Sequence, residues 1–95
     1  MNNGKVSILG TEYKVTEGAG LGVTEIDGQC MNYKKMIQIR VPADMLEQDA
    51  SEAEKRIRYE EVMRHEIVHA FLFESGLDEY FQNEQLVNWI ANSVP

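Results

Sequence analysis

The sequence predicts an α+β fold, in which a small antiparallel sheet of three to four strands packs on a central helix and a second, C-terminal helix. Short segments that alternate apolar and polar residues lie before Pro42. A long segment with helix-capping residues at both ends follows, and a second apolar helical segment comes near the end of the chain. With 95 residues, the chain is expected to form one domain, 1–95.

Alternation predicts the strands of the first half. Val6–Ile8 and Tyr13–Val15 are short alternating segments, and Gly10-Thr11 between them suits a hairpin turn. Leu21–Ile26 indicates a further short strand, and Asp27-Gly28 after it is typical of a turn.

Met36–Val41 is the clearest strand, since three β-branched residues alternate with two polar ones before Pro42 ends it. A helical turn is expected at Asp44–Gln48.

The helices of the second half are predicted from their ends. Ser51 and Glu54 form a capping-box pattern, and Gly76 is typical of a helix C-terminus, so one helix is expected from Ser51 to about Ser75. A second helix is predicted over roughly Phe81–Asn92. The aromatic side chains of this half have helical spacing and are expected in the core: Phe71, Phe73, Tyr80, Phe81 and Trp89.

His65-Glu66-Ile67-Val68-His69 is an H-E-x-x-H motif inside the predicted long helix. Residues four apart lie on one helical face, so both imidazoles can reach one metal ion. Glu66 is offset around the axis by about 100°, which leaves it beside the ion as a proton acceptor for a metal-activated water. Imidazole and carboxylate ligands around an open position favour zinc.

Two histidines are too few protein ligands for a catalytic zinc site, and the chain has no other histidine. A carboxylate after the motif is therefore expected. Glu84 is favoured, because a second helix that turns back would bring it beside His69, and Asp78 and Glu79 stay open as alternatives. Glu74 is expected to face away from the two histidines. Cys30 is expected in a turn far upstream.

The chain resembles the zincin metallopeptidases, and most closely the small gluzincin type. The resemblance rests on the H-E-x-x-H motif and on the segment 83–88, Asn-Glu-Gln-Leu-Val-Asn, and it covers roughly residues 36–92. It implies that Glu84 is the third zinc ligand. The family's N-E-x-x-x-D pattern has an aspartate where this chain has Asn88, and that aspartate orients a zinc-binding histidine. The segment is also similar to metallopeptidases encoded by phages and mobile elements that act on repressors.

The resemblance further implies that a strand near the site aligns an extended peptide substrate, and Met36–Val41 is similar in position. The function expected is a zinc-dependent peptidase that hydrolyses peptide bonds, with Glu66 as general base. Tyr80 and Arg58 are possible oxyanion donors, although a structural role is favoured for each. The alternatives are a metal-stabilised binding or regulatory module without turnover, and a metal-free helical interaction protein.

The composition of the chain limits the classes of binding partner that we expect. The net charge is −7 and the nine Lys and Arg residues are scattered, which argues against nucleic acid or an anionic membrane as a partner. A peptide or protein substrate is expected instead, and the oligomeric state stays open. One cysteine and an N-terminus without an apolar segment lead us to expect a cytoplasmic protein.

Overall fold

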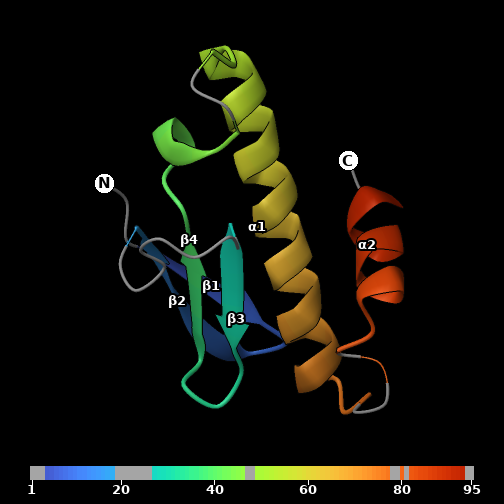
Figure 1. The fold of residues 1–95 in the computed structure, drawn as a ribbon. Helices are drawn as coiled ribbons and strands as arrows, with labels where there is room; N and C mark the ends of the chain where they lie inside the picture. The colour runs from blue at the N-terminus through green and yellow to red at the C-terminus, as the bar shows by residue number, and fades with distance from the viewer. Residues whose placement is uncertain (1–3, 19–26, 47–48, 78–79, 81, 94–95) are drawn as a thin grey trace.

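The computed structural model of the chain has the predicted α+β class, with a four-stranded sheet and two helices (Figure 1). It describes residues 4–18, 27–46, 49–77, 80 and 82–93. The strand predicted at Leu21–Ile26 lies outside these residues. Within them, neither helix is long and apolar enough to cross a membrane.

The sheet has the spatial order β1-β2-β4-β3. Its strands are β1 (Gly4–Ile8), β2 (Thr11–Glu17), β3 (Gly28–Met31) and β4 (Met36–Ile39). The hairpins β1–β2 and β3–β4 are antiparallel, but β2 and β4 run parallel, so the expectation of a purely antiparallel sheet is wrong. The parallel pair follows from the strand order, since β3 comes between β2 and β4 in the chain but lies on the far side of β4.

Two turns differ from their predicted places. The β1–β2 turn lies at Leu9 and Gly10, one residue earlier than expected, and both residues have positive φ, 50° and 86°. That backbone matches the primed turns of two-residue hairpins. The turn predicted at Asp27-Gly28 is wrong, because Gly28 begins β3 and the β3–β4 turn covers residues 32–35. A short 3₁₀ helix lies at Pro42–Asp44, earlier than the helical turn predicted at Asp44–Gln48, of which residues 47–48 lie outside the described residues.

The long helix α1 (Glu52–Glu74) confirms the capping prediction. The Ser51 hydroxyl accepts a hydrogen bond from the Glu54 amide at 3.1 Å, and the Glu54 carboxylate accepts one from the Ser51 amide at 2.8 Å. At the other end Gly76 has φ 81°, the left-handed conformation that ends a helix. Both ends are thus set by local sequence.

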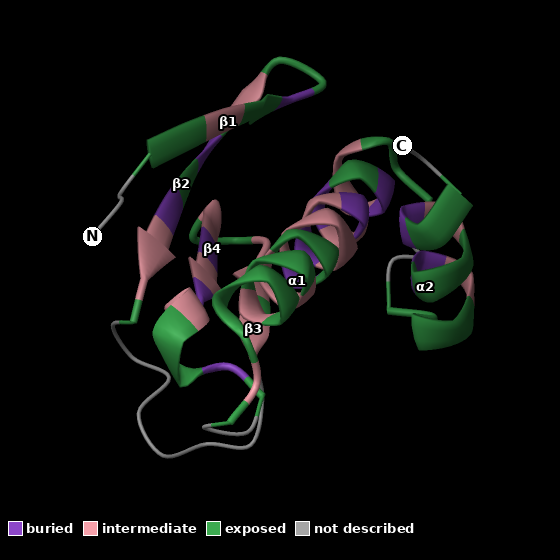
Figure 2. Cartoon of the chain, turned by 90° about the horizontal axis from the view of Figure 1, so that it is seen from above, coloured by how far each residue is buried: buried purple, intermediate pink, exposed green. Residues whose placement is uncertain are grey.

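Helix α1 lies between the sheet and α2 (Glu84–Ser93), as Figures 1 and 2 show. The larger core joins one side of α1 to the sheet and consists of Ile8, Tyr13, Val15, Ile37, Ile39, Met45, Val62 and Ala70. The smaller core joins the other side to α2 and consists of Val68, Leu72, Val87 and Ala91. These two cores place the sheet and α2 on opposite sides of α1.

The prediction that the aromatic residues of this half fill the core is wrong for three of them. Trp89, Phe71 and Tyr80 are exposed, Trp89 by 69%. Aliphatic residues make the α1–α2 contact, and Trp89 lies two positions after the buried Val87, which turns it by about 200° away from α1. Phe81 lies outside the described residues.

Candidate metal centre

The helical geometry of α1 brings His65 and His69 together, as their spacing predicts. Their Nε2 atoms are 3.2 Å apart, and both side chains are largely buried. Two ligands of a tetrahedral zinc ion, each about 2.0–2.1 Å from the metal, lie about 3.3 Å apart. The pair is therefore already spaced for one ion.

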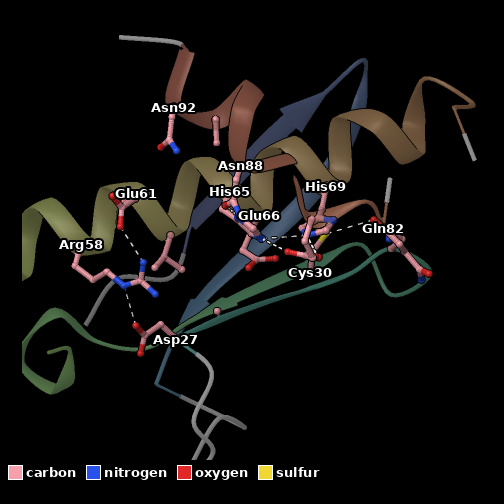
Figure 3. A pocket seen from close by; sticks show the side chains of 15 residues that line it. Asp27, Cys30, Arg58, Glu61, His65, Glu66, His69, Gln82, Asn88 and Asn92 are labelled. Atoms are coloured by element: carbon pink, nitrogen blue, oxygen red, sulfur yellow. Dashed lines mark hydrogen bonds and ion pairs between the residues drawn. The ribbon is translucent and has the colours of Figure 1, made fainter. Parts of the chain in front are cut away.

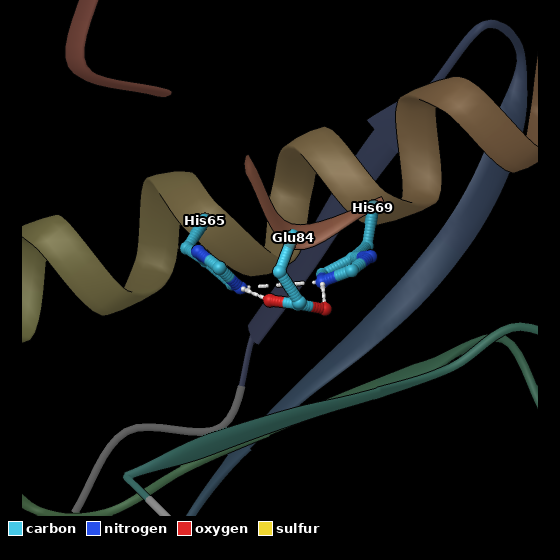
Figure 4. A group of neighbouring side chains, drawn as sticks. All are labelled: His65, His69 and Glu84. Atoms are coloured by element: carbon cyan, nitrogen blue, oxygen red, sulfur yellow. Dashed lines mark hydrogen bonds and ion pairs between the residues drawn. The ribbon is translucent and has the colours of Figure 1, made fainter. Parts of the chain in front are cut away.

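Glu84 reaches the two histidines from α2 (Figure 4). Its Oε1 lies 2.8 Å from Nε2 of His65, and its Oε2 lies 3.0 Å from Nε2 of His69. Of the described His, Cys, Asp and Glu residues, these three form the group that could hold a metal ion, with all ligand atoms within 4.8 Å. The structure thus brings together the three ligands expected from the sequence. Asp78 and Glu79 lie outside the described residues.

Helix α2 places Glu84 at its first position, because the helix begins later than the predicted Phe81. The Asn83 Oδ1 accepts a hydrogen bond from the Leu86 amide at 3.0 Å, which is an N-cap contact. A carboxylate in the first turn also interacts favourably with the helix dipole. The cap therefore fixes where the helix starts and with it the position of Glu84.

Asn88 contacts the ring nitrogen of His65 that faces away from Glu84. Its Oδ1 lies 2.8 Å from Nδ1 of His65, and because a carboxamide oxygen only accepts, Nδ1 carries the hydrogen. In the neutral ring, Nε2 of His65 then presents a lone pair to the Glu84 carboxylate and to His69. Three electron-pair donors that converge in this way favour a cation between them, so the donor set fits zinc.

Glu74 lies away from this centre, as expected. Its carboxylate accepts hydrogen bonds from Tyr13 and Lys35, each at 2.6 Å, and from Thr11 at 3.2 Å. The hydrogen bond from the Lys35 ammonium is the main reason that the pKa of Glu74 lies below its usual range, and the Tyr13 bond adds to it. The residue thus ties the end of α1 to the sheet.

Glu66 is the buried acidic residue beside the two histidines, with 6% of its surface exposed. Burial raises the pKa of its carboxyl group, and the neighbouring His65 and His69 oppose that shift. The residue follows His65 directly and faces the gap between α1 and β3, where Gly28 lies against it. A carboxylate with a raised pKa next to a metal position is suited to accept and return a proton.

A groove of about 960 Å³ contains this centre and is lined by residues of α1, β3 and α2 (Figure 3). Cys30, expected in a turn, lies instead in β3 and lines the groove. Its thiol donates to Oδ1 of Asn32 at 3.3 Å, and burial raises the pKa of Cys30 to about 12, so the thiol stays protonated at neutral pH. Sequence alone did not place it there, because strand pairing decides its surroundings.

The two oxyanion candidates differ in position. Tyr80 is exposed and does not line the groove. Arg58 does line it, but it bonds Asp27 and Glu61 at the end of the groove beyond His65 (Figure 3).

Gly28 permits the close approach of β3 to α1. A Cβ atom there would lie 2.5 Å from Cγ1 of Val62 and 3.3 Å from Oε2 of Glu66. We therefore expect Gly28→Ala to lower the free energy of unfolding by about 1–3 kcal/mol, as overpacking does, in a urea titration. Val62→Ala removes the side chain that this Cβ atom would meet. The double variant Gly28→Ala/Val62→Ala should therefore lose less free energy of unfolding than the two single variants lose together.

Gly4→Ala is the matched control, because nothing lies within 4 Å of a Cβ atom at that position. If Gly28→Ala unfolds with the same urea midpoint as the wild type, the close packing of β3 on α1 is contradicted.

Comparisons of this chain with protein-family models, with curated proteins and with solved structures give no match. The function is therefore argued from the site alone.

Proposed function

We propose that the protein is a zinc-dependent peptidase that resembles the small gluzincins. The observation that carries the proposal is the convergence of His65, His69 and Glu84 next to the buried carboxylate of Glu66, inside an open groove. Three protein ligands with room for a further group are typical of catalytic rather than structural zinc sites.

In the proposed hydrolysis, metal binding and proton transfer are assigned to different residues. His65, His69 and Glu84 would hold the zinc ion, which when bound supplies Lewis acidity to a peptide carbonyl and to the attacking water. Glu66 accepts the proton of the attacking water and passes it to the leaving amine. Its buried position supports this role, because burial raises the pKa of the carboxyl group and so makes it a stronger proton acceptor.

The outer strand β3 is the better candidate for aligning a peptide than the strand 36–41 expected from the sequence. β4 lies between β2 and β3, so its edges are used within the sheet. β3 has one strand neighbour among the described residues, and it borders the groove. An extended peptide would add antiparallel to β3, which favours unfolded or flexible segments as substrates.

One experiment tests the proposal in two steps. Elemental analysis of protein purified without chelator is expected to find about one zinc per chain. The same protein is expected to cleave a chemically unfolded protein, with cleavage lost after chelation and restored by zinc.

The outcomes separate the competing functions. Zinc without cleavage would overturn the peptidase and favour the metal-stabilised binding module. Absence of metal, with no binding of added zinc, would favour the helical interaction protein.

A further inference from the structure

A guanidinium group is held at the end of the groove beyond His65. The Arg58 side chain donates from Nε to Oδ2 of Asp27 at 2.9 Å and from Nη1 to Oε1 of Glu61 at 2.8 Å. Asp27 is itself engaged on its other oxygen by Arg40, at 3.2 Å. These contacts orient Arg58 in the wall of the groove, as Figure 3 shows for Arg58, Asp27 and Glu61.

The two carboxylates do not hold Arg58 equally firmly. Asp27 is shared between two guanidinium groups, and its side chain is 21% exposed. Glu61 is 47% exposed and bonds Arg58 as a neighbour three residues along the same helix, a type of contact that contributes little to stability. The Nη2 group of Arg58 has no partner among the described residues. A carboxylate entering the groove can therefore bind Nη2 and replace Glu61 on Nη1.

The position of Arg58 along the groove defines where such a carboxylate lies. Asp27 precedes β3, and Gly28 lies against Glu66, so β3 runs from the Arg58 end towards the end near Asn32. A peptide that pairs antiparallel with β3 therefore has its C-terminal half near Arg58. Arg58 is seven residues before His65, about 10 Å along the helix axis, which corresponds to about three residues of extended peptide.

We propose that Arg58 is a specificity residue that binds a carboxylate of the peptide substrate, two to three residues on the C-terminal side of the cleaved bond. This inference rests on the proposed peptidase function. The carboxylate belongs either to an Asp or Glu side chain or to the free C-terminus of a short peptide. A planar guanidinium with paired N–H groups suits either one, since both present two oxygens in a plane.

The test uses zinc-loaded Glu66→Gln protein, so that binding is read without turnover. Fluorescein-labelled eight-residue peptides of neutral residues, blocked at both ends, carry Asp, Asn or Lys in the C-terminal half, and binding is followed by fluorescence anisotropy. The Asp peptide is expected to bind at least about tenfold more tightly than the Asn peptide. A neutral peptide with a free C-terminus forms a further arm, which separates the two sources of the carboxylate. A peptide with Asp in its N-terminal half should bind no more tightly than the matching Asn peptide.

Variants with opposite expected effects assign the effect to Arg58. Arg58→Gln should abolish the preference for Asp over Asn, whereas Glu61→Gln should increase it, because the competing carboxylate is gone. Arg56→Gln is the matched control, since it removes the same charge from an exposed position of α1 that does not line this groove. It should leave the preference unchanged.

Three results would overturn the inference: equal binding of the Asp and Asn peptides, tighter binding of the Lys peptide, or a preference for Asp that persists in Arg58→Gln. Cleavage of an unfolded protein together with any of these would leave the peptidase function standing. If no peptide binds and no cleavage occurs, both the inference and the proposed function fail.

Discussion

Glu66→Gln is expected to lower the rate of peptide cleavage at least about a hundredfold and to leave zinc binding intact. Glutamine keeps the shape of the side chain but cannot accept a proton at neutral pH, and general acid–base catalysis contributes typically about 10²–10⁴-fold. Glu66 is not among the three residues whose ligand atoms converge. The zinc content of the variant should therefore equal that of the wild type.

The measurement is the initial rate of cleavage of one unfolded protein, with zinc determined on the same samples. Glu60→Gln is the control, because it makes the same chemical change at an exposed position of α1. Wild-type rates in Glu66→Gln would remove Glu66 from the mechanism. Loss of zinc in that variant would instead indicate that Glu66 holds the metal.

Substitutions of the proposed zinc ligands are expected to lower the affinity for zinc strongly. Changes in residues that only orient zinc ligands cost about 10–100-fold in affinity, so removing a ligand outright should cost more. We expect His65→Ala to weaken zinc binding by more than about a hundredfold. Glu84→Gln, which keeps a weaker neutral oxygen ligand, should weaken it at least about tenfold. Competition with a chromophoric chelator measures both affinities.

Thermal unfolding provides a second readout of the same site. A ligand that binds only the folded state stabilises it by about 4 kcal/mol at a thousandfold excess over its Kd, so wild-type protein should melt several degrees higher with zinc than with chelator. That difference should shrink in His65→Ala and Glu84→Gln. Zinc binding weakened by Asp78→Asn or Glu79→Gln but unaffected by Glu84→Gln would move the third ligand into the loop before α2.

Local sequence determined the parts of the site that depend on a single helix. The spacing of His65 and His69 places both rings on one face of any regular helix, and Ser51 and Gly76 set its two ends through contacts with nearby backbone. The sequence limited the third ligand to a few carboxylates after the motif. It did not select Glu84 by spacing alone, because the position of Glu84 requires α2 to pack back on α1.

Tertiary structure alone decided the walls of the groove. Asp27-Gly28 has the composition of a turn, yet Gly28 lies in a strand, where its missing side chain admits Val62 and Glu66. Arg58 meets Asp27 across 31 residues of chain. The order of the strands, with β4 inside and β3 at the edge, determines both contacts. Alternation of apolar and polar residues specifies which face of a strand is buried but not which strand lies beside it, because that choice depends on packing between segments distant in the chain.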